Sequence, residues 1–264
     1  MSKWELYDAL IEKIPADIKV EYFCQGVHWT IVRSENRTGI AMTIRQKGPR
    51  IMDGSSNLEG MPLKDAAALI KSWDYYEASI GMAALNCFYN TPEKVRNLGG
   101  FESMDLSKLT EADRIKNEVF NTFYDNLKGK KVAVVGHFPD LEKRLEGQCE
   151  LSILEREPQS GDYPDPACEY IMEDQDHVFI TGTTLTNKTL PRLLELIPKK
   201  AKLNLVGPSV CFSEEFFNRG VDYLSGFSIL NNREIDQHIR MGSQMQIFST
   251  GVMVNIGRDF RSDD

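Results

Sequence analysis

Positive charge is in deficit in this chain. Its 264 residues include 31 Lys and Arg against 39 Asp and Glu, which gives a formal net charge of -8. A uniformly acidic surface repels phosphate backbones, so nucleic acid is not an expected partner. Apolar runs that could span a bilayer are also lacking, and the first residues hold no apolar stretch typical of a signal peptide. We therefore expect a cytoplasmic protein without a membrane partner.

Cysteine is scarce and irregularly spaced. The chain has five cysteines, an odd number, with no C-x-x-C pair. This pattern argues against a disulfide framework and against a structural zinc knuckle. We expect free thiols in a reducing compartment at Cys24, Cys87, Cys149, Cys168 and Cys211.

Several motifs of cofactor and catalytic sites are missing as well. The sequence has no P-loop and no nucleophile elbow. The turn after the first long apolar strand of the C-terminal half reads Gly136-His137-Phe138-Pro139 in place of G-x-G-x-x-G. The dinucleotide-binding fingerprint is therefore absent from this turn.

What is present is the composition of an ordinary globular protein, with 41% hydrophobic and 27% charged residues. Apolar periodicity over the first hundred residues predicts helix, then antiparallel strands, then helices. The small residues of the last of these helices favour close packing. The expected helices span residues 2–14, 62–70 and 73–87, and the expected strands span residues 20–25, 27–33 and 38–45.

The pattern changes after Gly129. Continuous apolar strands then alternate with helical stretches, which is typical of a parallel sheet with helices on its faces. Residues 90–110 read as a long connection and residues 111–127 as a helix. We expect strands at 131–135, 150–154, 177–181, 203–206 and 221–227, and helices at 140–145, 187–196, 213–218 and 233–241. The predicted fold class is α/β, with a small α+β domain at residues 1–100 and a Rossmann-like parallel-sheet domain at residues 101–264.

Glycines follow three of the predicted strands, at Gly136, Gly182 and Gly207. Parallel sheets bind ligands outside the carboxyl ends of their strands, and glycine lets a ligand approach the backbone closely. Three such turns in register predict a shared binding edge, although each glycine could simply end its strand.

The segment from Thr181 to Asn187 concentrates hydroxyls and backbone N–H groups at a strand end. Such a place suits a carboxylate, a phosphate or another anion. The alternative is that Thr186 or Asn187 caps the next helix. Glu155 and Glu157 lie about twenty residues beyond Gly136, where nucleotide-binding relatives carry a ribose-binding carboxylate. A solvated pair of charges explains them equally well.

A metal site at this edge would need ligands that the topology gathers. His137, Cys168 and Cys211 could meet there and would suit a soft or borderline ion. Their spacing matches no metal motif, so the identity of any metal stays open. His28 and His238 fit structural or surface positions.

Three C-terminal segments, at residues 161–167 (GDYPDPA), 180–190 (ITGTTLTNKTL) and 206–209 (VGPS), resemble the heavy-metal chelation domain family, long classed as having unknown function. Residues 54–57 and 78–85 are similar to the domain that usually precedes it. The resemblance implies an enolase N-terminal-like domain, a Rossmann-like domain and a ligand cleft between them. It also implies a role in binding or making a metal chelator.

Carried over by position, the resemblance and the strand ends give one set of candidate site residues. His137 and Asp165 are the candidates for moving a proton. The candidate ligand-binding residues of the C-terminal domain are Gly136, Phe138, Glu155, Thr181, Gly182, Thr183, Thr184, Asn187, Gly207, Pro208 and Ser209. Ser55, Asn57 and Asn86 would face them from the N-terminal domain.

Three functions are compatible with these residues. The leading hypothesis is a protein that binds a small polar ligand, with a metal ion or metal chelate as the expected cofactor. The alternative is a transferase that uses a nucleotide or S-adenosylmethionine. The third is an interaction module without a ligand. Whether a reaction is catalysed, and whether the chain forms a homo-oligomer, the sequence leaves open.

Overall fold

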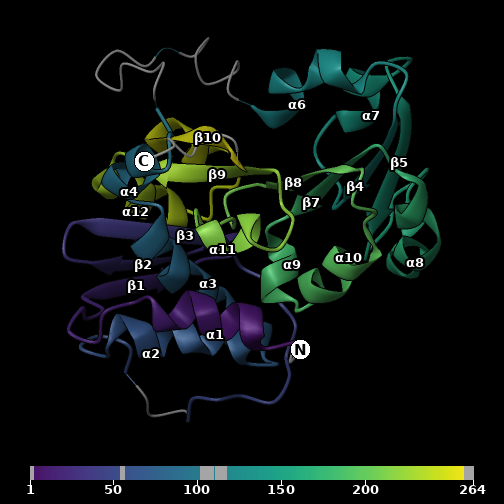
Figure 1. The fold of residues 1–264 in the computed structure, drawn as a ribbon. Helices are drawn as coiled ribbons and strands as arrows, with labels where there is room; N and C mark the ends of the chain where they lie inside the picture. The colour runs from purple at the N-terminus through teal and green to yellow at the C-terminus, as the bar shows by residue number, and fades with distance from the viewer. Residues whose placement is uncertain (1–2, 54–56, 102–109, 111–117, 259–264) are drawn as a thin grey trace.

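A computed structural model describes residues 3–53, 57–101, 110 and 118–258 of the chain. Two sheets organise it, one of three strands and one of seven. In Figure 1 the N-terminal strands and helices form the lower layers, and the large sheet runs above them toward the right. The α/β fold class predicted from the sequence is confirmed.

The N-terminal unit is an antiparallel meander covered by helices. β2 lies between its two partners, and the tight turn that joins it to β3 pairs Ser34 with Arg37. The strands are β1 (Tyr22–Gln25), β2 (Trp29–Ser34) and β3 (Arg37–Met42). The helices are α1 (Glu5–Glu12), α2 (Leu63–Ala68), η1 (Leu69–Lys71) and α3 (Tyr75–Tyr89).

Close packing of α3 depends on two glycines. A Cβ atom on Gly81 would lie 2.0 Å from the backbone nitrogen of Ile70 in η1. One on Gly39 of β3 would lie 2.0 Å from the nitrogen of Cys87. Helix and sheet therefore touch backbone to backbone, which is the close packing that the small residues of this segment predict.

The large sheet has the strand order β10-β9-β8-β7-β4-β5-β6. All neighbouring pairs are parallel except β9 with β10. Its strands are β4 (Lys131–Val135), β5 (Glu150–Glu155), β6 (Tyr163–Pro164), β7 (His177–Thr181), β8 (Lys202–Val206), β9 (Tyr223–Ile229) and β10 (Gly251–Gly257). The chain goes outward from β4 on one side and returns through β7 on the other. The topological switch point, where open α/β sheets bind ligands, therefore lies between β4 and β7.

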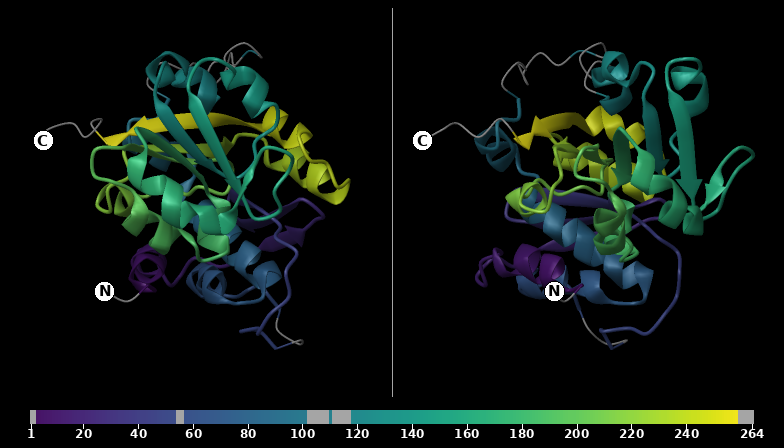
Figure 2. Two further views of the ribbon diagram at one scale, coloured as in Figure 1. Left: turned by 90° about the vertical axis from the view of Figure 1, so that its right-hand side faces the viewer. Right: turned by 45° about the vertical axis from the view of Figure 1, so that its right-hand side comes forward.

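Helices cover both faces of this sheet (Figure 2). They are α4 (Pro92–Asn97), α6 (Val119–Thr122), η3 (Tyr124–Leu127), α7 (Leu141–Leu145), η4 (Asp165–Ala167), α8 (Cys168–Ile171), η5 (Met172–Asp174), α9 (Thr183–Thr186), α10 (Leu190–Leu196), α11 (Glu214–Phe217), α12 (Asn232–Arg240) and η6 (Gln246–Thr250). One face packs against α6 and η3 through a separate apolar cluster. The main core continues from the other face into the N-terminal unit.

The predicted strands of both units are found, but some other elements differ. α4 lies inside the expected connection at 90–110, because Thr91 caps it and Pro92 starts it. The helix expected at 187–196 begins only at Leu190, because Lys188 adopts a left-handed conformation with φ of 66°. β6 and β10 were not predicted. The expected helix at 111–127 lies partly outside the described residues.

Asn90, at the end of α3, joins the two units. Its buried amide donates to the carbonyls of Val210 (2.8 Å) and Phe227 (3.2 Å), and its side-chain oxygen accepts from the nitrogen of Phe212 (3.0 Å). Ser228 donates to its backbone carbonyl at 2.9 Å. The N-terminal unit is therefore fixed directly to the strand ends of β8 and β9. None of the helices in the described ranges has both the length and the apolar character to cross a membrane.

Candidate functional site

The loops after β4, β7 and β8 lie side by side. A Cβ atom on Gly136 would come within 3.0 Å of the Thr181 side chain, so the loops after β4 and β7 approach each other closely. A Cβ atom on Gly182 would lie 2.6 Å from the carbonyl carbon of Ser209. Gly136 and Gly207 also have φ of 105° and 106°, which favours glycine. The three turns thus form one edge, with the switch point in its middle.

The threonine segment at this edge is largely bonded to itself. The Thr181 hydroxyl accepts from the Thr183 hydroxyl at 3.1 Å, and the Thr184 hydroxyl donates to the Thr181 carbonyl at 2.7 Å. Asn187 accepts from the nitrogen (3.1 Å) and the hydroxyl (2.6 Å) of Thr189. Asn187 therefore stabilises the turn before α10. The half-buried Thr181 lies next to Gly136, and Thr183 is bonded to it.

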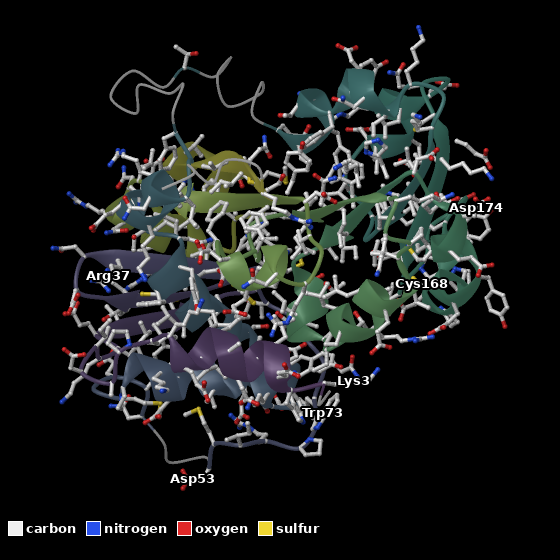
Figure 3. The ribbon with its side chains drawn as sticks, in the orientation of Figure 1. Lys3, Arg37, Asp53, Trp73, Cys168 and Asp174 are labelled. Atoms are coloured by element: carbon white, nitrogen blue, oxygen red, sulfur yellow. The ribbon has the colours of Figure 1, made fainter. Side chains whose placement is uncertain are left out.

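The N-terminal unit holds the loop after α9. Tyr7 donates to the Leu185 carbonyl at 3.0 Å, and Tyr75 donates to that of Asn187 at 3.2 Å. The Lys188 ammonium donates to the carbonyls of Ser72 and Thr186 and lies 5.6 Å from the centre of the Trp73 ring. Burial lowers the pKa of Lys188 to about 8. Trp73 is labelled at this junction in Figure 3.

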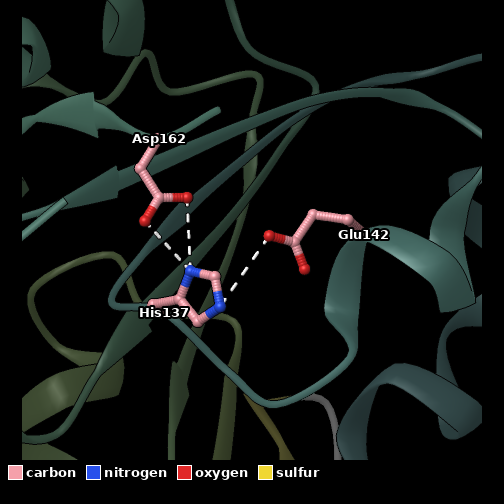
Figure 4. Close-up of side chains that lie close together, drawn as sticks. All are labelled: His137, Glu142 and Asp162. Carbon is pink, nitrogen blue, oxygen red and sulfur yellow. Dashed lines mark hydrogen bonds and ion pairs between the residues drawn. The ribbon is translucent and has the colours of Figure 1, made fainter. Parts of the chain in front are cut away.

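His137 is held by two carboxylates (Figure 4). Its Nδ1 lies 3.0 and 3.2 Å from the two oxygens of Asp162, whose side chain is 1% exposed. Its Nε2 lies 3.7 Å from an oxygen of Glu142 on α7. The His137 backbone nitrogen donates to Glu155 at 2.8 Å, and Asp162 also accepts from the Gln159 nitrogen at 2.8 Å. The imidazole is therefore fixed in position beside the switch point.

This arrangement decides which ring nitrogen can act. A buried carboxylate at Nδ1 favours the tautomer with the proton on that nitrogen, because the carboxylate can only accept. The lone pair of Nε2 then points toward Glu142. Such a nitrogen can accept a proton from a ligand or bind a metal ion, and a carboxylate behind a histidine is the usual second partner of a metal-binding imidazole.

The donor atoms fit a first-row metal ion. One ligand atom each from His137, Glu142 and Asp162 lies within 4.8 Å of the others. Imidazole and carboxylate suit borderline and hard divalent ions better than soft ones. The sequence left open that His137, Cys168 and Cys211 meet, but in the described residues the partners of His137 are carboxylates. Cys168 is buried on α8 (Figure 3), and Cys211 is buried beyond β8. Burial raises the pKa of both thiols.

Three other candidates of the C-terminal domain, Asp165, Phe138 and Glu155, have structural contacts of different kinds. Asp165 lies 3.5 Å from Arg156, and the carboxylate beside His137 is that of Asp162. Phe138 packs edge-on against Phe120 at a ring-centre distance of 5.4 Å, so it supports the loop through apolar contact. Glu155 accepts from three backbone nitrogens and thereby braces the turn that carries His137.

Of the residues expected to face the edge from the N-terminal unit, Asn86 lies at the contact between the two units and Asn57 does not. Asn86 donates to the Ile40 carbonyl (2.7 Å) and to the Pro208 carbonyl (3.1 Å). Ser209 accepts from the Met42 nitrogen at 2.9 Å. These contacts join the units directly. Asn57 is exposed and accepts from the Glu59 nitrogen, and Ser55 lies outside the described residues.

Glu142 and Asp162 are the members of the cluster that sequence reasoning missed. Asp162 lies within the GDYPDPA segment, which pointed to Asp165 instead. The two-residue strand β6 pairs with the end of β5 and brings the preceding loop back over β4. An edge strand this short leaves no periodic signal, so the sequence could not show which aspartate meets His137.

Two family models match the chain, and both carry the description "Putative heavy-metal chelation". One covers residues 118–257 and the other residues 7–89. The chain belongs to this family. The two matches lie on either side of the expected domain boundary.

Two solved structures share the fold across nearly the whole chain, and one further protein is similar in sequence. A crystal structure of a protein with unknown function from Desulfitobacterium hafniense is 40% identical, with a TM-score of 0.85 over 97% of this chain and 99% of that one. A second, from Pyrococcus horikoshii, has a TM-score of 0.76 at 21% identity, covering 97% and 100%. An uncharacterized protein of Methanocaldococcus jannaschii is 27% identical over 255 residues, which is 90% of each chain.

Proposed function

We propose that this protein binds a divalent metal ion, or the complex of such an ion with a small polar chelator, at the edge between β4 and β7. His137 Nε2 and Glu142 are the protein ligands in this proposal, and Asp162 orients the imidazole. The observation that carries it is the His137–Asp162 contact at 3.0 Å, with the second ring nitrogen directed at Glu142. The family description of heavy-metal chelation supports the same chemistry.

Two protein ligands leave most coordination positions of a divalent ion open. A chelator that carries carboxylates or hydroxyls could fill them, and Thr181, Thr183 and the backbone at Gly136 lie at the same edge. We place the ligand there and away from Asn86 and Pro208, because these two residues already contact each other. If a proton is moved, His137 is the group to accept it.

The test measures metal binding to the full chain, by the absorption of Co²⁺ and by calorimetry with Zn²⁺. We expect His137→Ala to abolish stoichiometric binding. Asp162→Asn should weaken binding by roughly 10- to 100-fold, the usual effect of losing the group behind a metal-binding histidine. His28→Ala removes an imidazole from the N-terminal unit and is the matched control. Equal affinity in the wild type and the His137→Ala variant would remove the proposal.

The transferase alternative keeps one supporting observation, the strand order with its switch point between β4 and β7. Against it, the carboxylate of Glu155 is already engaged by three backbone nitrogens. Thermal stabilisation by S-adenosylmethionine or nucleotides, without stabilisation by metal ions, would favour the transferase.

A further inference from the structure

A groove of about 470 Å³ lies between the two units, far along the sheet from His137. One wall is the turn between β1 and β2, and the other is the end of α12. In Figure 1 these elements lie at the left, whereas β4 and β5 lie at the right. The lining residues are Cys24, Gln25, Gly26, Val27, Arg45, Tyr76, Ile239, Arg240 and Gly242.

The charged side chains that line this groove are both guanidinium groups. Arg45 is exposed and has no carboxylate partner among the residues that the structure describes. Arg240 is partly neutralised, because its Nε donates to Asp236 at 3.0 Å and its Nη2 to the Tyr22 hydroxyl at 2.9 Å. Its Nη1 keeps two N–H groups for another acceptor. The chain has a net charge of -8, so a groove whose charged lining residues are both cations differs from the charge of the whole protein.

Neutral groups complete the wall. Tyr76 is half-buried and contributes an aromatic face and a hydroxyl. A Cβ atom on Gly26 would lie 2.8 Å from the Ile239 carbonyl oxygen, so the β1–β2 turn touches the end of α12 where both line the groove. Gln25 is fixed by its bonds to Thr30 (3.2 Å) and to the Tyr76 carbonyl (2.8 Å). The groove is thus a hollow of neutral groups lined by two guanidinium groups, those of Arg45 and Arg240.

We propose that this groove is a second ligand site, which binds a small molecule through a carboxylate or phosphate group held by Arg45 and Arg240. The planar guanidinium group forms paired hydrogen bonds with both kinds of oxyanion. The volume lies within the range of small-molecule pockets. The site shares no residue with the His137 cluster, so either can fail without the other.

Cys24 gives a local measurement of occupancy, because it is half-buried and lines the groove. The full chain is used with Cys149→Ser, which removes the other half-buried thiol. The alkylation rate of Cys24 by neutral iodoacetamide is followed while inorganic phosphate or citrate replaces chloride at constant ionic strength. We expect a saturable slowing of at least about fivefold, together with a rise in melting temperature.

Arg45→Gln should weaken this protection about tenfold, the loss expected for a charged hydrogen-bonding partner. Arg96→Gln makes the same charge change on exposed α4 and should leave it intact. Protection by phosphate alone assigns a phosphorylated ligand, and protection by citrate alone assigns a carboxylate. If neither anion slows alkylation or raises the melting temperature, or if both arginine variants behave alike, the site does not exist.

Discussion

Glu77 is a carboxylate that the fold buries in the first turn of α3, with 1% of its side chain exposed. It accepts from Arg50 Nε (2.7 Å), the Ser72 hydroxyl (2.6 Å), and the nitrogens of Ile51 (2.7 Å) and Met52 (3.2 Å). Burial alone raises its pKa, but these four donors more than reverse that effect, so the pKa of Glu77 is lowered. One side chain therefore anchors the segment that follows β3.

We predict that Glu77→Gln lowers the free energy of unfolding by about 2–3 kcal/mol at pH 7, because the neutral amide loses charge-assisted bonds and leaves donors unpaired. A group with a lowered folded pKa stabilises above its unfolded value and loses that effect as pH falls. The difference in the free energy of unfolding between Glu77→Gln and the wild type should therefore become smaller below about pH 4.5. Urea denaturation at pH 7 and at a pH below 4.5 measures this change.

Glu12→Gln, at the exposed end of α1, is the control and should cost little at either pH. A Glu77→Gln difference that is unchanged at low pH would show that shape, and not charge, fixes the segment.

At the scale of single residues, the sequence predicts which side chains belong to a site better than it predicts which side chains contact each other. His137 could be singled out because it follows a glycine at a predicted strand end. Its contacts with Asp162 and Glu142 depend on how the loops before β6 and after β4 fold back. Those side chains are brought together by tertiary pairing, which leaves no local pattern in the chain.

At the scale of elements, the contact between α3 and η1 makes a sharp prediction. Gly81→Ala should destabilise the protein by about 2–3 kcal/mol, the upper part of the usual cost of overpacking, although alanine favours a helix more than glycine. The added methyl would collide with the backbone of Ile70, which cannot move aside like a flexible side chain. Thermal and urea denaturation of the purified variant measure the cost.

Gly60→Ala separates collision from backbone strain. No atom lies within 4 Å of a Cβ at Gly60, but its φ is 85°. This control should cost about 1 kcal/mol from conformation alone. If Gly81→Ala costs no more than Gly60→Ala, the packing described for α3 is wrong.

Elements with continuous apolar runs were predictable, because burial on both faces removes polar residues from a parallel strand. β4 and β7 match their predicted bounds for this reason. β10 was missed because it returns antiparallel at the edge and its residues Met253 and Asn255 are only partly buried. α9 was missed because its residues were interpreted as the turn after a strand. The helix expected at 187–196 starts later than predicted because a left-handed Lys188 is not an expected helix break.

For the molecule as a whole, buried titrating groups predict how alkali unfolds it. Burial raises the pKa of Cys87 and Cys168 to about 12 and also that of Cys211. A raised folded pKa gives stability that is complete below the unfolded value and is lost as pH rises. Lys94 and Lys188, whose pKa values burial lowers to about 8, oppose this loss only up to their unfolded value of 10.5. Stability should therefore fall most steeply above that pH.

Cys87→Ala isolates one thiol. Above pH 9, the unfolded-state value of the thiol, its deficit relative to the wild type should shrink by about 1.4 kcal/mol per pH unit, because one fewer proton is released on unfolding. Urea denaturation at several alkaline pH values measures this slope. Ile31→Val also removes buried volume but no ionisable group, so its deficit should stay constant. Parallel curves for Cys87→Ala would contradict the burial of that thiol.

The hydrogen bonds of Asn90 have a consequence for how the two halves of the chain evolve. An amide that meets Val210, Phe212 and Phe227 is matched to carbonyls and an N–H group on the opposite half. Recombination that replaced one half with that of a distant homologue would leave these buried polar groups without hydrogen-bond partners. The two segments should thus be inherited together, and a gene split between them should yield fragments that survive only when co-expressed.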